Sequence, residues 1–135
     1  MTLYADSSAL LKRYVHEPDS EAAEQLLRTD PVLLTGRHTM VEVRRNLARL
    51  LSGSDLARAR SAFARDMAVM SVVELDATTC EAAATIAEAL GTRTLDALHL
   101  GAARRVGSGS GVSFLTYDVR QAQAARSLGF TVLGA

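Results

Sequence analysis

The feature that most constrains this chain is the regular alternation of short apolar runs with segments of helical period. Five runs have the length and composition of strands: TLYAD (2–6), PVLLT (31–35), VMSVVEL (69–75), VSFLTY (112–117) and FTVLG (130–134). Strands that alternate with helices typically form a mostly parallel sheet with helices on both faces. The sequence therefore predicts an α/β fold, a three-layer α/β/α sandwich around a mostly parallel five-stranded sheet.

The segments between these runs have the apolar spacing of helices. Helices are predicted over 7–15, 17–28, 39–51, 55–68, 77–91, 94–106 and 119–129. In the fifth of these, Thr78 followed by Glu81 has the pattern of a capping box, and Gly91 has the position of a helix stop. The GSGSG stretch at 107–111 is predicted to be a loop before a strand, and it lacks the Lys-Ser/Thr of a phosphate-binding P-loop.

Length and composition indicate an ordinary globular protein. A chain of 135 residues is long enough to bury a substantial core, so residues 1–135 are predicted to form one domain. No apolar run approaches a membrane span and the start lacks a signal-peptide pattern, so we expect a cytoplasmic protein with no membrane partner. Cys80 is the lone cysteine, which excludes an internal disulfide; it is predicted to be a buried apolar filler.

Four acidic residues occupy positions that the predicted fold makes informative. Asp6 ends the first predicted strand, and Asp118 follows the fourth and opens a helix. In an open α/β sheet, ligands bind outside the carboxyl ends of the strands. Asp96 and Glu42 lie in the first turns of two helices, where acids also stabilise the helix dipole or cap the helix. Any one of them therefore has an ordinary structural explanation, including a pairing of Glu42 with Arg45 or Asn46.

Together, the four acids are harder to explain by helix capping alone. If the strands that carry Asp6 and Asp118 are neighbours, the two carboxylates approach each other, and two like charges ~4 Å apart repel by roughly 4 kcal/mol at an effective dielectric of ~20. Such a group must protonate, spread apart or hold a cation. No Cys/His cluster has zinc-ligand spacing, and a set of hard oxygen ligands favours Mg²⁺ or Mn²⁺. A metal of this kind can activate water against a phosphodiester.

The charge balance is compatible with a polyanionic substrate. The formal net charge is zero, which argues against nucleic-acid binding by bulk charge. Without the four acids, however, the chain has eleven acidic side chains and fifteen basic ones, so the rest of the protein is net positive. Fourteen of the fifteen basic residues are Arg, a bias that suits phosphate recognition but that a GC-rich genome also produces.

Four segments together resemble the PIN domain, and within it the VapC toxins of bacterial type II toxin–antitoxin pairs. They are "YADSSALLKRYVHEP", "MVEVRRNL", "RTLDALHLGAA" and "FLTYDVRQAQAARSLGF". The likeness runs from about Leu3 to the C-terminus and depends on the order Asp, Glu, Asp, Asp. It implies a Mg²⁺- or Mn²⁺-dependent endoribonuclease that cleaves structured RNA, tRNA or rRNA, with metal-activated water. It also implies a homodimer that a VapB-type antitoxin silences by forming a hetero-oligomer with it.

The resemblance assigns roles to particular residues. Its catalytic residues are Asp6, Glu42, Asp96 and Asp118, of which Asp6 and Asp96 hold the metal. Ser7 and Thr116 match positions whose hydroxyls orient these acids, although a turn Ser and a strand Thr explain them equally well. Of the arginines that lie nearest to the acids in the sequence, Arg13, Arg93 and Arg120 are candidate RNA contacts; the others are Arg37, Arg44 and Arg45. His99 is interpreted as a packing or solvent-facing residue, and His16 and His38 have no assigned role.

Two other interpretations stay open. A strand-end Asp with Mg²⁺ also serves phosphatases of the haloacid dehalogenase type, but those need a second Asp where this chain has Ser8, and a downstream Lys where it has only Lys12. The other is a catalytically silent module that binds RNA or a protein partner, with acids that are merely structural.

Overall fold

A computed structural model describes residues 2–29, 32–107 and 111–135. Its centre is one sheet of five strands, in the order β3-β2-β1-β4-β5, and every neighbouring pair is parallel. The strands are β1 (Thr2–Ala5), β2 (Val32–Gly36), β3 (Ser71–Val73), β4 (Val112–Thr116) and β5 (Thr131–Gly134). The predicted fold class is confirmed.

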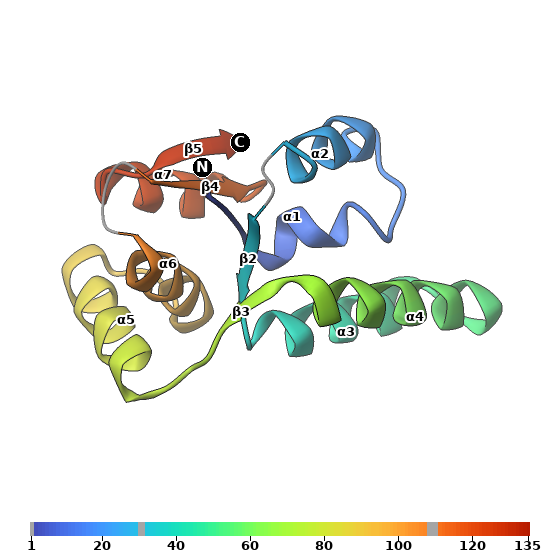
Figure 1. The fold of residues 1–135 in the computed structure, drawn as a ribbon, viewed down its shortest axis with the longest axis horizontal. Helices are drawn as coiled ribbons and strands as arrows, with labels where there is room; N and C mark the ends of the chain where they lie inside the picture. Colours follow the sequence, from blue (N-terminus) through green and yellow to red (C-terminus); the bar gives the residue numbers. More distant parts are fainter. Residues whose placement is uncertain (1, 30–31, 108–110) are drawn as a thin grey trace.

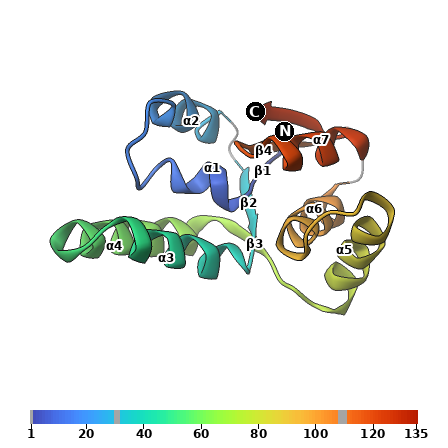
Figure 2. The same ribbon diagram turned by 180° about the vertical axis from the view of Figure 1, so that it is seen from behind.

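In the described part of the chain, seven helices cover the two faces of this sheet. They are α1 (Ser7–Leu11), α2 (Ser20–Leu27), α3 (Thr39–Leu50), α4 (Gly53–Val69), α5 (Ala77–Leu90), α6 (Thr94–Val106) and α7 (Val119–Ser127). Figures 1 and 2 show α1 to α4 on one side of the strands and α5, α6 and α7 on the other. Among the described residues, no helix has both the length and the apolarity needed to cross a membrane.

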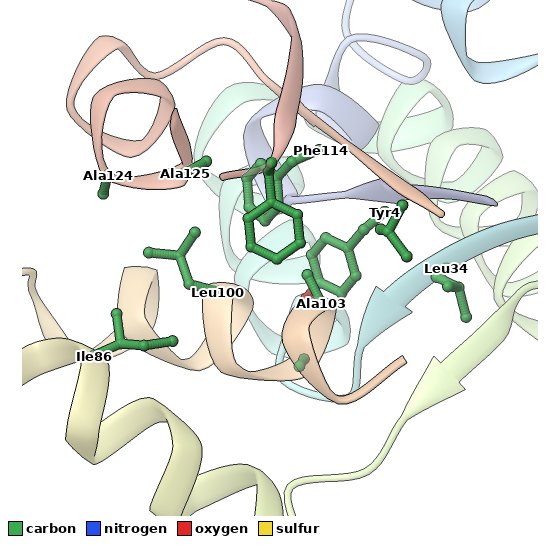
Figure 3. Close-up of a cluster of buried hydrophobic side chains, with 11 residues drawn as sticks. Tyr4, Leu34, Ile86, Leu100, Ala103, Phe114, Ala124 and Ala125 are labelled. Atoms are coloured by element: carbon green, nitrogen blue, oxygen red, sulfur yellow. The ribbon is translucent and has the colours of Figure 1, made fainter. Parts of the chain in front are cut away.

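The alternation of side chains along each strand supplies a separate core for each face. Leu3 and Ala5 of β1 pack with buried residues of α1, α3 and α4, whereas Tyr4 between them belongs to the opposite core. In that second core Tyr4 stacks on Phe114, with ring centroids 5.3 Å apart and an interplanar angle of 16°. Figure 3 shows these two rings above Leu100 and Ala103 of α6. A strand buried on both faces is the expected environment of a parallel sheet.

The strand order positions the site. The chain leaves β1 toward β2 on one side, and β4 pairs with the other side of β1, with Ala5 opposite Leu115. The neighbouring strands of a parallel sheet whose connections diverge in this way open a crevice at their carboxyl ends. Asp6 and the residues after Thr116 therefore lie together at the carboxyl ends of two neighbouring strands, where their charges can repel each other.

Some local predictions are wrong. Asp76 is the N-cap of α5, because its Oδ1 accepts from the Thr79 amide at 2.9 Å; Thr78 lies within the helix and forms no capping box. The predicted stop at Gly91 is confirmed by its left-handed φ of 69°. Cys80 is exposed on α5, not buried.

The third predicted strand is also too long. Of 69–75, only Ser71–Val73 pair in the sheet, because α4 extends to Val69, whose side chain is 85% exposed. Pro31 of the second predicted strand and residues 108–110 of the predicted glycine-rich loop lie outside the described residues.

Candidate active site

Asp6 lies where the first strand ends and α1 begins. It is the N-cap of α1, and its Oδ1 accepts hydrogen bonds from the Ala9 amide at 3.1 Å and from the Ser8 hydroxyl at 2.6 Å. The residue is only 4% exposed. Burial raises the pKa of Asp6, although the nearby His99 and the hydroxyls of Ser8 and Thr116 favour its charged form. A cation beside this carboxylate would stabilise its charged form, because burial alone disfavours that form.

Ser8 connects Asp6 to the end of β4. Its hydroxyl oxygen accepts from the Tyr117 amide at 2.9 Å and lies 3.3 Å from Thr116 Oγ1. Thr116 Oγ1 in turn accepts from the Asp118 amide at 3.1 Å. Asp6 and the backbone of Asp118 are thus held by one chain of short side chains, which orients the two strand ends relative to each other.

Glu42 points into the site from the first turn of α3. Its Oε1 accepts from Ser7 Oγ at 2.6 Å and lies 2.7 Å from His99 Nε2. Burial raises the pKa of Glu42, but the hydrogen bonds and charges of His99, with help from Ser7 and His38, lower it below its usual value. Glu42 therefore stays ionised. The alternative that it pairs with Arg45 or Asn46 on an exposed helix face is wrong.

His99 is 2% exposed, and hydrogen bonds hold its ring on both sides. Its Nδ1 lies 2.8 Å from the Tyr4 hydroxyl, opposite the bond between Nε2 and Glu42. Burial and the charges of Asp6 and Glu42 raise the pKa of Tyr4 well above its usual value, so the phenol keeps its proton. His99 is therefore a packed residue, but one in a buried polar chain from Tyr4 to Glu42 and not a solvent-facing one.

Asp96 and Asp118 form the open side of the site. Asp118 is the exposed N-cap of α7, and its Oδ1 accepts from the amides of Arg120 at 2.9 Å and Gln121 at 3.3 Å. Asp96 is half-buried in the first turn of α6. Its pKa is raised by burial first and by the charge of Asp118 next, with smaller contributions from Asp6 and Glu42 and with His99 opposing. Each of the other three acids thus acts electrostatically on Asp96.

A pocket of about 370 Å³ opens between α6 and α7 beside this pair. Asp96 and Asp118 line it, and so do Arg93 and Arg120, two of the three arginines expected to contact RNA. Arg13 lies elsewhere, where its guanidinium binds Glu24 at 2.8 Å and Asp66 at 3.5 Å. Its role in RNA binding stays a prediction, whereas the other two arginines share a pocket with acids of the site.

The donor set fits a hard divalent cation. Asp6 and Asp118 each use only Oδ1 in hydrogen bonds, and the Asp96 carboxylate has no hydrogen-bond donor among the described residues. The four carboxylates do not form a tight cage, because the one group of three or more His, Cys, Asp or Glu ligand atoms within 4.8 Å of one another in the described residues is His38, Glu42 and His99. Mg²⁺ usually binds one or two carboxylates and keeps several waters, so a loose set of oxygens suits it.

No part in the site was predicted for Ser8, Tyr4 or His38. A Ser two residues after an N-cap Asp is a recognisable local pattern. His38 directly precedes the helix predicted over 39–51, and its spacing of four residues from Glu42 places both on one side of the helix start. Tyr4 gives no such signal, because an aromatic residue in an apolar strand is ordinary core.

The chain has clear relatives. The PIN domain model matches residues 3–127. Ribonuclease VapC46 of Mycobacterium tuberculosis is 36% identical over 131 residues, which cover 97% of this chain and 95% of that protein. Among solved structures, VapC20 of Mycobacterium tuberculosis, described as a sarcin–ricin loop cleaving toxin, matches with a TM-score of 0.69 at 19% identity, over 91% of this chain and 95% of that one.

A toxin–antitoxin complex from Klebsiella pneumoniae also matches with a TM-score of 0.69, at 12% identity, over 90% of this chain and 89% of that one. At these low identities the solved structures show the shared fold alone. The family model and the relative with 36% identity show more: the chain belongs to the PIN-domain family, among the VapC-type ribonucleases.

Proposed function

We propose that this protein is a Mg²⁺-dependent endoribonuclease, the toxin of a type II toxin–antitoxin pair, and that Asp6, Glu42, Asp96 and Asp118 are its catalytic acids. The observation that carries the proposal is geometric: Asp6 and Asp118 follow the paired strands β1 and β4, and Asp96 lines the same pocket as Asp118. The charges of the other three acids also raise the pKa of Asp96. Four segments far apart in the sequence bring these charges to one strand edge. A cation among them removes the repulsion.

Each acid has a distinct part in the proposed reaction. Asp6 and Asp96 hold the cation, and Ser7 and His99 keep the ionised carboxylate of Glu42 directed toward it. When bound, Mg²⁺ supplies activation of water and stabilisation of the charge that develops on the phosphate. Asp118 Oδ2, to which no group of the described chain donates, is left to accept the proton that the attacking water loses.

The pocket between α6 and α7 is the proposed binding site for RNA. The guanidinium groups of Arg93 and Arg120 bind phosphate oxygens through paired N–H donors, which places a phosphodiester against Asp96 and Asp118. Both arginines are exposed and therefore accessible to a large RNA. Structured RNA, tRNA or rRNA, is the expected substrate.

A protein partner has its own support. Val41, Leu95 and Val119 are exposed large apolar side chains, and each is the sequence neighbour of one of the acids Glu42, Asp96 and Asp118. Exposed apolar residues around a charged site are typical of a surface that another protein covers. Solved neighbours of this fold include a toxin–antitoxin complex, which is consistent with an antitoxin segment on this surface. A homodimer remains a prediction from the resemblance.

The phosphatase alternative has little support in the geometry. Lys12 is bound to Glu17 at 2.5 Å and to Asp19 at 2.9 Å, so it is not directed at Asp6. Ser8 stands two residues after Asp6 and holds that carboxylate through a hydrogen bond, where a phosphatase of this type needs an acid.

Incubation of purified protein with total cellular RNA tests the proposal. We expect discrete cuts in one or a few RNAs with Mg²⁺, none with excess EDTA, and none by Asp6→Asn with Mg²⁺. Undiminished cutting in EDTA or by Asp6→Asn contradicts the assigned site. Metal-independent RNA binding without any strand scission favours the silent binding module instead.

A further inference from the structure

Beside the four acids lies a second set of ligand atoms with different chemistry. One ligand atom each from His38, Glu42 and His99 lies within 4.8 Å of the other two. His38 Nε2 is 3.8 Å from Glu42 Oε1, and His99 Nε2 is 2.7 Å from the same oxygen. The two imidazole rings stand 3.9 Å apart between centroids. The set joins the start of α3 to the middle of α6, and neither histidine has a part in the proposed cleavage chemistry as a ligand.

His38 is buried without a hydrogen-bond partner. The residue is only 7% exposed, and in the described part of the chain neither Nδ1 nor Nε2 has a partner at hydrogen-bonding geometry. The Leu95 backbone is the one acceptor with an influence on the ring, and of the groups that act on the pKa of His38 its effect is the smallest. Native structures rarely leave a buried polar group unpaired, so such a group calls for an explanation by an unseen ion or ligand. Burial and the nearby His99 lower the pKa of His38 to about 4, which keeps the ring neutral and leaves one nitrogen with a free lone pair.

The space for the His38 ring depends on Gly36 at the end of β2. A Cβ at position 36 would lie 2.7 Å from Cε1 and 2.8 Å from Nδ1 of His38, and 2.9 Å from the Tyr4 hydroxyl. These distances are shorter than real Cβ contacts. The absence of a side chain at Gly36 therefore leaves the space that the His38 ring and the Tyr4 hydroxyl occupy.

His99 has the support typical of a metal ligand. Histidines that bind metal generally make a hydrogen bond through the second ring nitrogen, which fixes the orientation of the ring. In His99 that partner is the Tyr4 hydroxyl, 2.8 Å from Nδ1, and Nε2 is the nitrogen on the side of Glu42. A phenol can donate to this nitrogen or accept from it, so the ring can present a lone pair at Nε2.

Two imidazole nitrogens and one carboxylate oxygen match a borderline transition metal. Zn²⁺ binds such ligands at about 2.0–2.2 Å with tetrahedral geometry, which places neighbouring ligand atoms roughly 3.4 Å apart. The separations of 2.7 and 3.8 Å from Glu42 Oε1 bracket that value. Three protein ligands leave one position for water or another ligand.

We propose that His38, Glu42 and His99 form a binding site for one divalent transition metal ion of the Zn²⁺ class, separate from the hard-cation site of the acids. The two sites share Glu42. A Zn²⁺ ion that draws Glu42 toward the histidines removes it from the acid set, so Zn²⁺ lowers Mg²⁺-supported RNA cleavage. This last consequence rests on the proposed function, whereas the binding itself does not.

Isothermal titration of the 135-residue chain, free of any histidine tag, measures the binding directly. With Mg²⁺ in excess, we expect one Zn²⁺ per chain and a loss of affinity of at least about tenfold in His38→Ala. His16→Ala is the matched control, because His16 is the third histidine and lies exposed in the α1–α2 connection. Absence of Zn²⁺ binding by the unaltered chain, or equal affinity in His38→Ala, overturns the proposal.

Nitrogen-15 spectra of the histidine rings give a second test that needs no variant and so does not depend on how His38→Ala folds. The chain has three histidines. Addition of Zn²⁺ should shift the ring nitrogens of His38 and His99 and leave those of His16 unchanged. A response of His16 alone, or of no ring, overturns the proposal.

Asp96→Asn separates this proposal from the proposed function. The variant should lose Mg²⁺-supported cleavage and keep its Zn²⁺ affinity, because Asp96 does not belong to the histidine set. If the unaltered chain cleaves RNA and binds no Zn²⁺, the transition-metal site alone is rejected. If it binds Zn²⁺ and cleaves no RNA, the ribonuclease assignment alone is rejected.

Discussion

The two sides of the site are built in opposite ways. On the side called here the buried wall (Tyr4, Asp6, Ser7, Glu42 and His99), each residue is at least partly buried and each side chain has a hydrogen-bond partner. On the side called the open wall (Arg93, Asp96, Asp118 and Arg120), the side chains are exposed or half-exposed and line a pocket. The buried wall holds charge in position, and the open wall remains free to meet a substrate. Substitutions on the two walls should therefore have different effects: on the buried wall they change the stability and the charge of the site, and on the open wall they change how it meets a substrate.

The largest expected effect is on the buried wall, in Asp6→Asn. The amide oxygen can still accept from Ala9 and Ser8, so the cap and the fold remain, but the charge that holds the cation is lost. We expect RNA cleavage to fall by roughly 10³-fold, equivalent to about 4 kcal/mol of transition-state stabilisation. Single-turnover cleavage at saturating Mg²⁺ measures it.

The same variant should be more stable than the unaltered chain when metal is absent. Because burial raises the pKa of Asp6 in the folded state, ionisation costs stability, and the free energy of unfolding falls as the pH rises through that pKa. Below the usual pKa of an Asp side chain the two proteins should unfold alike, and above the raised pKa the Asn variant should be the more stable. Urea unfolding in EDTA between pH 3 and 7 is the measurement, and a less stable Asn variant at pH 7 contradicts the role of the buried wall.

On the open wall, Asp118→Asn should weaken cleavage less, by roughly 10²-fold. It should also lower the pKa of Asp96, since the Asp118 carboxylate is the neighbouring charge that raises that pKa most. A titration of Asp96 by NMR in the metal-free chain measures the shift. Asp76→Asn is the matched control, because Asp76 caps α5 as Asp118 caps α7 but has no part in the site. An unchanged Asp96 pKa in Asp118→Asn contradicts the convergence of the acids.

The difference between the walls also explains what the sequence could predict. The strand-end positions of Asp6 and Asp118 follow from the alternation of strands and helices, because a parallel sheet brings its carboxyl ends to one edge. The position of Glu42 against Ser7 and His99 does not follow, because it depends on how α3 and α6 pack across the sheet edge. Local pattern leaves such contacts between distant segments open. At the start of α5 the difficulty was different: both Thr78 and Asp76 are residue types that cap helices, and the structure shows that Asp76 is the cap.

His99 shows where the limit lies. Its spacing from Asp96 places it one turn along the same helix, which is compatible with solvent, packing or substrate. Only the tertiary structure shows that it turns away from the open wall and joins Tyr4 to Glu42. Cys80 is the reverse case: a residue type that is usually buried lies exposed, because it is not on the buried face of α5, which Thr79, Ala83 and Ile86 form.

A smaller effect is expected from the arginines of the open wall. Replacing Arg93 and Arg120 by Ala should raise KM by roughly tenfold with little change in kcat, and should reduce the salt dependence of RNA binding by about one unit of slope for each phosphate that the protein no longer neutralises. Arg60→Ala is the control, since Arg60 is exposed on α4, on the far side of the sheet from α6 and α7. A fall in kcat with unchanged KM would place these arginines in the chemistry and not in binding.

The smallest effect returns to the buried wall, in Tyr4→Phe. The ring remains stacked on Phe114, so the change removes only the hydroxyl that holds His99 Nδ1. The loss of one buried hydrogen bond should lower the free energy of unfolding by about 1 kcal/mol, measured in urea. Tyr14→Phe removes a hydroxyl bonded to Asp66, away from the site, and should cost a similar amount of stability. Only Tyr4→Phe should also shift the ring nitrogens of His99. If both variants leave those signals unchanged, the hydroxyl of Tyr4 does not orient His99, and the contact of His99 with Glu42 is maintained without it.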